Sequence, residues 1–296
     1  MRASFRLLAL LMLPAALACG TSRASVGAAA GDDGGPSNGA AAAQGGIPPG
    51  AAEADARLAA SPRHGEWAMV SAGAADSVRA WVVYPERRDR APVVIVVHEI
   101  FGLTSWVRAV ADQLAADGFI AIAPDFLTGR NLPLDSAGQP VRDSAVAAVR
   151  ALDPGGVQRR IDAVARYGMR LPAALPRYGI TGFCWGGSVA FNHAVHSQQV
   201  GASVVFYGTS PAPDALRSVR APVLGLYGEN DARVNATIAP ADSAMRALGR
   251  VYEHEIFAGA GHGFVRQQDG QNGANLEATR RAWPRAVAFF RQHLRG

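Results

Sequence analysis

A cysteine stands at the centre of a glycine-rich run, TGFCWGG, at residues 181–187. An apolar segment precedes this run and a helical pattern follows it. That is the layout of a nucleophile elbow, a strand-to-helix turn that lifts one reactive side chain clear of a sheet. Gly182 and Gly186 flank Cys184 at the positions where the chain doubles back and needs residues without a Cβ. The run therefore predicts a thiol nucleophile and hydrolysis through a covalent intermediate.

Two further polar residues follow in the order expected of a catalytic triad. Asp231 ends the run YGEND, and His262 lies in the run AGAGHGF; each run comes after an apolar segment. The order nucleophile, Asp, His is that of the α/β-hydrolases. We expect His262 to take the proton of Cys184 and Asp231 to hold the imidazole tautomer. An imidazolium and the N-terminus of a helix near Trp185 are both expected to favour the thiolate.

Each of these residues also has a purely structural interpretation. A single cysteine such as Cys184 is often only a small buried apolar residue. Asp231 follows an asparagine, and this pair of residues is common in turns. His262 alone is more often structural, but its glycine-rich loop and the triad order favour catalysis. Glu99 follows a fully apolar run, at the strand end where ligand groups collect, and the alternative for it is a solvated loop acid.

The elements that must position these residues alternate between strand and helix. Alternation of this kind predicts an α/β fold, a mostly parallel sheet with helices on both faces. We expect strands at 67–70, 79–84, 92–97, 119–123, 178–181, 202–206, 223–227 and 253–257, and helices at 105–117, 144–150, 157–171, 188–196, 237–248 and 277–293. The candidate site residues all fall just past strand ends, where ligands bind in such sheets.

Four runs together resemble the dienelactone hydrolase family: HEIFG at 98–102, GFCWGG at 182–187, GEND at 228–231 and GHGF at 261–264. The resemblance extends from about Trp67 to the C-terminus. It implies an α/β-hydrolase fold with a Cys-His-Asp triad, which in this chain is Cys184, His262 and Asp231. The implied reaction is the cleavage of a carboxylic ester or lactone.

The same resemblance implies roles for other residues. The backbone N–H groups of Ile100 and Trp185 would form the oxyanion hole, and Glu99 would take part in activating the thiol. Arg266, four residues after His262, matches an arginine that holds a substrate carboxylate, and Arg142 matches a second one. The substrate stays open between a dienelactone and other small esters, lactones or thioesters. A general carboxylesterase or thioesterase is the alternative activity, and a non-catalytic binding protein of the same fold is the alternative class.

The first residues have the pattern of an export signal. Arg2 and Arg6 precede an apolar stretch at 7–17, and ALA at 16–18 fits a small-x-small cleavage site. Cys19 follows at once, which resembles a bacterial lipobox. We therefore expect a signal peptide at 1–18, lipidation at Cys19 and a periplasmic or cell-surface protein anchored to a bacterial membrane. Ordinary cleavage that leaves a free thiol is the alternative.

The composition then divides the rest of the chain. Residues 19–62 are rich in Ala, Gly, Ser and Pro and have no periodic apolar pattern, which predicts a flexible tether. Residues 63–296 are expected to form the hydrolase domain. The chain has 296 residues, of which 49% are hydrophobic, so this part can bury one sizeable core.

The formal net charge is +5, and every basic residue other than histidine is an arginine. The arginines are scattered rather than gathered in a basic tract, so we expect no nucleic-acid partner. The histidines show no spacing typical of metal ligands, so we expect no metal and no other cofactor. The expected partner is a small-molecule substrate, and the sequence leaves the oligomeric state open.

Overall fold

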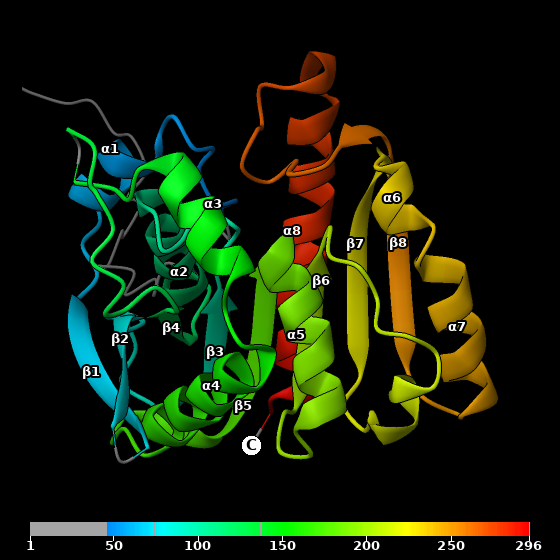
Figure 1. Ribbon diagram of the computed structural model, residues 1–296, viewed down its shortest axis with the longest axis horizontal. Coiled ribbons are helices and arrows are strands. Elements are labelled where there is room, and N and C mark those ends of the chain that lie inside the picture. Colours follow the sequence, from blue (N-terminus) through cyan, green and yellow to red (C-terminus); the bar gives the residue numbers. More distant parts are fainter. Residues whose placement is uncertain (1–45, 74, 137, 296) are drawn as a thin grey trace, which may run out of the picture. The chain divides into compact units, whose positions relative to one another are not determined.

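The computed structural model describes residues 46–295 apart from 74 and 137 (Figure 1). Its strands form one eight-stranded sheet in the order β1-β2-β4-β3-β5-β6-β7-β8. The strands are β1 (Gly65–Gly73), β2 (Asp76–Val83), β3 (Ala91–Val97), β4 (Ile120–Asp125), β5 (Ala174–Phe183), β6 (Ala202–Phe206), β7 (Val223–Asn230) and β8 (Tyr252–Gly261). The β1–β2 and β2–β4 pairs are antiparallel and all other neighbours are parallel. The predicted fold class is confirmed.

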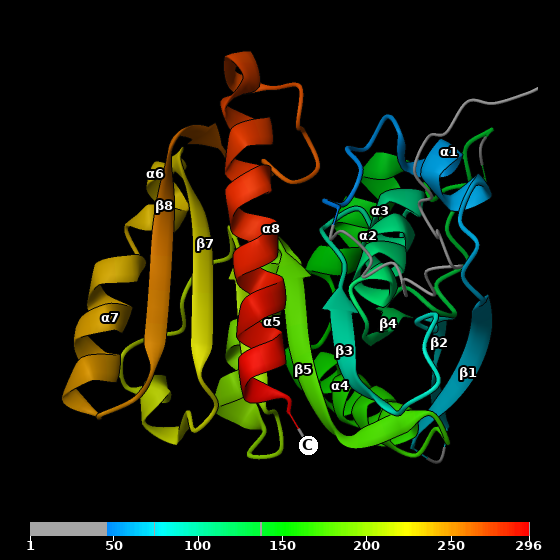
Figure 2. The same ribbon diagram turned by 180° about the vertical axis from the view of Figure 1, so that it is seen from behind.

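Helices cover both faces of this sheet. They are α1 (Ala54–Ala59), α2 (Ser105–Ala116), α3 (Arg142–Arg150), α4 (Pro154–Met169), α5 (Trp185–His196), α6 (Ala232–Asn235), α7 (Ile238–Ala247) and α8 (Ala274–His293), with short 3-10 turns at Ala215–Ser218 and Gln271–Gly273. α4 and α5 lie on the face seen in Figure 1, and α2 and α8 lie on the face seen in Figure 2. The sheet is therefore the middle layer of three.

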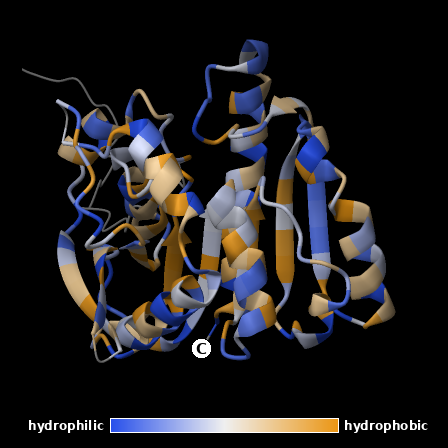
Figure 3. Ribbon diagram, viewed as in Figure 1, coloured by the Kyte–Doolittle hydropathy of each residue, from blue (hydrophilic) through white to orange (hydrophobic). Residues whose placement is uncertain are grey.

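The inner strands are apolar along their whole length because both of their faces are covered. In β3, Val93, Ile95 and Val97 pack into the core cluster that contains α4 and α5. The alternate residues Val94 and Val96 pack into the opposite cluster, which contains α2 and α8. Figure 3 shows the contrast between the hydrophobic inner strand β7 and the more hydrophilic β8 at the sheet edge.

The predicted strands and helices all exist, and the main differences are at their ends. β7 continues to Asn230 and β8 to Gly261, several residues past the apolar runs that predicted them. Asp231 and His262 therefore follow their strands directly. α3 begins at Arg142, two residues earlier than expected, which makes Arg142 the first residue of that helix. Apolar periodicity alone does not reveal these extensions, since the added residues are polar or small.

Residues 46–62 correct the predicted domain boundary, because they belong to the folded unit and not to a tether. Ala54 in α1 is 1% exposed. The carbonyl of Pro49 accepts a hydrogen bond of 3.0 Å from Trp106 Nε1 in α2. Small residues lack the periodic apolar pattern on which the prediction relied, yet they allow close packing on α2. The predicted signal peptide, Cys19 and residues 20–45 lie outside the described residues.

No helix within residues 46–295, as far as the structure describes them, has the length and apolar content to cross a membrane.

A buried ion pair ties the start of the domain to α2. Arg63 Nε and Nη2 donate to the two carboxylate oxygens of Asp112 at 3.0 and 2.6 Å, and the Asp112 side chain is 3% exposed. The Ser61 hydroxyl donates to the same carboxylate. The charge of Asp112 is thus compensated entirely from residues 61–63.

We predict that Arg63→Met lowers the free energy of unfolding by about 3–5 kcal/mol, because it leaves a buried carboxylate without its counter-ion. Urea denaturation measures this loss. The double variant Arg63→Met/Asp112→Leu removes both charges and should recover most of it. If Arg63→Met lowers the free energy of unfolding by less than about 1 kcal/mol, as expected for a solvent-exposed ion pair, the prediction is contradicted.

Candidate active site

Polar side chains follow the carboxyl ends of five neighbouring strands. β3, β5, β6, β7 and β8 lie side by side in that order and run parallel. The residues within two positions of these ends are Glu99, Cys184, Tyr207, Asp231 and His262. This edge of the sheet therefore gathers a thiol, two carboxylates, an imidazole and a phenol.

Cys184 sits in the turn that the sequence predicts. Its backbone has φ 57° and ψ −117°, a left-handed conformation that is strained for a non-glycine residue. A Cβ at Gly182 would collide with the carbonyl of Gly186, and a Cβ at Gly186 would collide with the carbonyl of Val97 at the end of β3. The two glycines are needed because the backbone of the elbow packs directly on itself and on its neighbour.

His262 and Asp231 form the expected pair. Nδ1 of His262 lies 2.5 Å from Oδ2 of Asp231, whose side chain is 8% exposed. The edge of the Tyr207 ring packs against the imidazole, with 5.2 Å between the ring centroids. The bond at Nδ1 leaves Nε2 of His262 for proton transfer, as a triad histidine requires.

The surroundings of Cys184 raise the pKa of its thiol. Burial, followed by the negative charge of Glu99, raises this pKa to about 11, although the N–H of Trp185 donates to the sulfur and lowers it. Among the hydrogen bonds of the described residues, none joins the Cys184 sulfur to His262. Burial and a nearby carboxylate therefore outweigh the helix N-terminus in their effect on this pKa.

Glu99 is a buried carboxyl group rather than a solvated loop acid. Its side chain is 3% exposed, and burial raises the pKa of Glu99 to about 7, against the lowering effects of Arg266 and Arg142. Nε of Arg266 lies 2.7 Å from Oε2 of Glu99, which makes a close ion pair. The structure thus brings Glu99 between the thiol and the two arginines.

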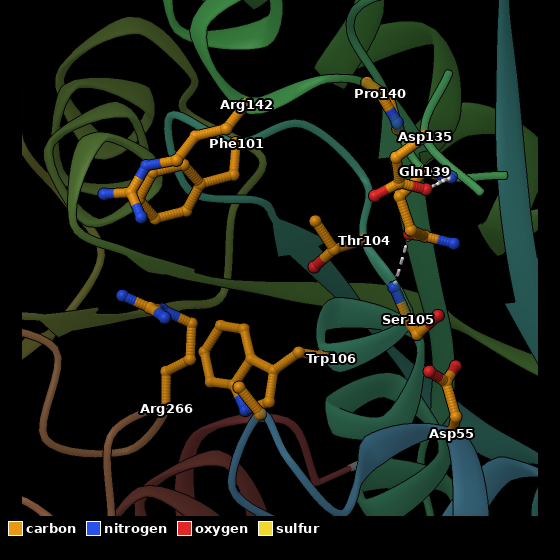
Figure 4. A pocket seen from close by; sticks show the side chains of 11 residues that line it. Asp55, Phe101, Thr104, Ser105, Trp106, Asp135, Gln139, Pro140, Arg142 and Arg266 are labelled. Atoms are coloured by element: carbon orange, nitrogen blue, oxygen red, sulfur yellow. Dashed lines mark hydrogen bonds between the residues drawn. The ribbon is translucent and has the colours of Figure 1, made fainter. Parts of the chain in front are cut away.

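Arg266 and Arg142 converge on one aromatic ring. The guanidinium carbon of Arg142 lies 4.6 Å from the ring centroid of Phe101, and that of Arg266 lies 5.0 Å from it (Figure 4). Both distances are in the range of cation–π contacts. The sequence analysis missed Phe101, although its place after Glu99 in the run HEIFG is a signal for it.

A cavity of about 300 Å³ opens beside these arginines. Phe101 and Trp106 give it apolar walls, and Arg142 and Arg266 give it two positive charges (Figure 4). Such a mixture of aromatic surface and a few charged groups is typical of small-molecule sites.

The two predicted oxyanion donors lie on segments that touch each other. Trp185 is the first residue of α5, where backbone N–H groups have no partner within the helix. Its ring stacks on that of the buried His98, with 5.4 Å between the centroids. In the described part of the chain, no backbone hydrogen bond uses the N–H of Ile100. The N–H of Ile100 is therefore available to a substrate oxygen, whereas the N–H of Trp185 is engaged with the Cys184 sulfur.

Within the described residues, no group of three or more His, Cys, Asp or Glu side chains is arranged to hold a metal ion.

Comparison with known sequences gives a consistent result. The model of the family described as "Dienelactone hydrolase family" matches residues 78–294. A Salmonella typhimurium protein named "Putative carboxymethylenebutenolidase" is 32% identical over 264 residues, which cover 83% of this chain and 96% of that protein. An Escherichia coli K12 protein of the same name is 31% identical over 230 residues, covering 74% of this chain and 83% of that protein.

Solved structures give the same result for the fold. A crystal structure of a protein described as a putative dienelactone hydrolase, from Klebsiella pneumoniae, has a TM-score of 0.67 and 29% identity, and covers 77% of this chain and 99% of that one. The dienelactone hydrolase from Anabaena variabilis has a TM-score of 0.59 at 22% identity, covers 79% of this chain and 99% of that one, and supports the fold alone.

The coupling between Glu99 and the thiol predicts a pH-dependent effect of Glu99→Gln. Glu99 is charged above a pH of about 7, and its charge raises the pKa of Cys184. Removing that charge should lower the thiol pKa by about one unit, which makes alkylation by iodoacetamide about tenfold faster at pH 8–9.

Below a pH of about 6 the wild-type carboxyl group is mostly protonated, so the two rates should converge. Glu86→Gln is the control, since the Glu86 side chain is 61% exposed and lies outside the site. Identical rate profiles for Glu99→Gln and the wild type would show that the carboxylate does not act on the thiol.

Proposed function

The chain belongs to the dienelactone hydrolase family and is a hydrolase of that type, and on this basis we propose that it cleaves a carboxylic ester or lactone through an acyl-enzyme at Cys184. His262 acts as the base and Asp231 as the residue that orients it. The observation that carries the proposal is the strained elbow of Cys184 on the same sheet edge as the His262–Asp231 pair.

The proposed reaction has two halves. In the first, His262 takes the proton of the Cys184 thiol as the sulfur attacks the carbonyl carbon, and the carbonyl oxygen becomes an anion held by the N–H groups of Ile100 and Trp185. The tetrahedral species collapses to a thioester, and the alcohol oxygen leaves with a proton from His262. In the second half, His262 takes a proton from water, the hydroxide attacks the thioester, and the free thiol and a carboxylate are released.

The thiol must lose its proton before the sulfur attacks. The charges around Glu99 indicate that this loss becomes easier when a substrate binds. Arg266 and Arg142 lower the pKa of Glu99, so a substrate carboxylate that engages the arginines weakens this effect and lets Glu99 take up a proton from solvent more readily. Once Glu99 is protonated, it no longer raises the pKa of Cys184. We infer that binding of an anionic substrate favours the thiolate, so that the nucleophile becomes reactive mainly when a substrate is present.

The arginines also indicate the class of substrate. A guanidinium offers a planar set of donors that suits a carboxylate, and here two of them face one aromatic ring at the wall of a cavity. The name of the relatives denotes a butenolide lactone that carries a carboxymethylene group, which combines both features. We propose a small ester or lactone with a free carboxylate; a general esterase or thioesterase is the alternative.

The location of the protein is proposed from residues 1–19 alone. The charged start, the apolar stretch and Cys19 support export and attachment to a bacterial membrane through a lipid at Cys19. In that case the enzyme meets its substrate outside the cytoplasm.

We predict that Cys184→Ala lowers kcat for a p-nitrophenyl ester by about four to six powers of ten, as expected for loss of a nucleophile. An unchanged thermal midpoint would show that the variant is folded. In the wild type, a slowly hydrolysed ester should add the mass of its acyl group to the peptide that contains Cys184. Retention of more than about a tenth of kcat corresponds to less than 1.4 kcal/mol and would remove Cys184 from the mechanism.

We also predict that Arg266→Ala removes most of the preference for an anionic substrate. For an ester with a free carboxylate and its neutral analogue, the ratio of the two kcat/KM values should fall by about 10- to 100-fold, as expected for a hydrogen bond to a charged group of about 1.5–3 kcal/mol. Because Arg266 also pairs with Glu99, Arg142→Ala is measured beside it, and the same ratio should fall there too.

Arg246→Ala is the control, since the Arg246 side chain is 76% exposed and pairs with Asp242 on α7. An equal loss on both substrates would mean that Arg266 only supports its loop.

A further inference from the structure

The residues before the β1–β2 hairpin form a strap beside the cavity that Arg142 and Arg266 line, defined here as residues 46–60. They precede residue 78, where the match to the family begins. The N–H of Ala51 donates to the carbonyl of Arg266 at 2.9 Å, and Nε2 of Gln268 donates to the carbonyl of Pro48 at 2.8 Å. The strap is therefore bonded to the same loop that carries the substrate arginine.

The strap is also fixed to α2 on its other side. Trp106 Nε1 donates to Pro49, and Nη2 of Arg57 donates to Oε1 of Gln113 at 2.8 Å. Ala54 is 1% exposed against the core. These contacts join the strap to two separate elements, so its position beside the cavity is set by the fold.

Two residues of the strap, Ala51 and Asp55, line the 300 Å³ cavity. Figure 4 shows Arg142, Arg266 and Phe101 on one side of this cavity and Asp55 on the opposite side. The cavity therefore has one end with two positive charges, whereas two carboxylates line the opposite side, that of Asp55 and that of Asp135, which accepts a hydrogen bond from the N–H of Gln139.

The cation that interacts electrostatically with Asp55 is Arg108, whose pKa is lowered by burial and only partly restored by the charge of Asp55. Arg108 points elsewhere, because its Nη2 donates to the Ser105 hydroxyl at 3.1 Å and its guanidinium carbon lies 5.8 Å from the centroid of the Trp81 ring. No ion pair within 4.0 Å joins Asp55 to a cation of the described residues. Its carboxylate thus remains an acceptor at the wall of the cavity.

We propose that the strap is a specificity element of the substrate cavity. The arginine end binds the single carboxylate of the substrate, and Asp55 at the strap end accepts a hydrogen bond from an uncharged group and repels a second anion. The enzyme therefore prefers monocarboxylate esters or lactones with a hydroxyl at the far end over dicarboxylate ones. This inference rests on the proposed function and goes beyond it by defining both ends of the substrate.

The test compares two esters that differ in the substituent of their central carbon, which is a hydroxyl in one and a second carboxylate in the other. The mono-p-nitrophenyl ester of 3-hydroxyglutaric acid has one free carboxylate and a hydroxyl, and that of tricarballylic acid has two free carboxylates. The wild type should have the higher kcat/KM for the hydroxy ester. Asp55→Asn keeps the size of the side chain and removes its charge, so the ratio of the two values should fall by about two- to fivefold, mainly through KM.

Glu53→Gln is the matched control, because it removes an equal charge from the same strap at a residue that does not line this cavity. It should leave the ratio at the wild-type value. Higher salt should lower the wild-type ratio toward that of Asp55→Asn, since screening weakens repulsion between exposed charges.

An unchanged ratio in Asp55→Asn, or an equal fall in Glu53→Gln, would overturn the proposal. If the wild type hydrolyses neither these two esters nor any other ester, the proposed function fails instead. The two failures are therefore distinguishable.

Discussion

The ion pair between Glu99 and Arg266 is the interaction on which the electrostatics of the site depends. A carboxylate that is 3% exposed is costly to keep charged, and here a guanidinium 2.7 Å away offsets part of that cost. The same carboxylate raises the pKa of the Cys184 thiol. One charge therefore connects Arg266 and Arg142 to the Cys184 thiol, so the proposed binding of a substrate carboxylate to these arginines would also change the pKa of the thiol.

The second constraint is the parallel sheet. Because β3, β5, β7 and β8 run in one direction, residues that are distant in the chain end at a single edge. The elbow can fit there only with glycines at 182 and 186, since its backbone touches the end of β3. The strain at Cys184 is held in place by this packing and by the N–H of Cys184, which donates to the carbonyl of Phe206 at 3.1 Å.

The sequence by itself determined the order and type of the elements and predicted the residues that are proposed to act at the site. Apolar runs bounded by glycine and polar turns are local signals, and they predict strands such as 92–97 because a strand covered on both faces has no polar alternative. The elbow glycines and the order of Cys184, Asp231 and His262 are equally local. The structure brings Asp231 and His262 together and places Cys184, Glu99 and Arg266 on the same edge of the sheet.

The tertiary structure alone decided three other properties. The pKa of the thiol is raised, because it depends on burial and on a carboxylate 85 positions earlier in the chain. Arg142 and Arg266 meet at Phe101, a contact between the start of α3 and two loops that no periodic pattern encodes. Residues 46–60 lie against the cavity although their composition predicts a tether, because small residues gain their order from the surface on which they pack. Local sequence patterns predict the conformation of a segment. Side-chain pKa values and cavity linings depend on residues that are distant in the sequence and become neighbours only in the folded protein.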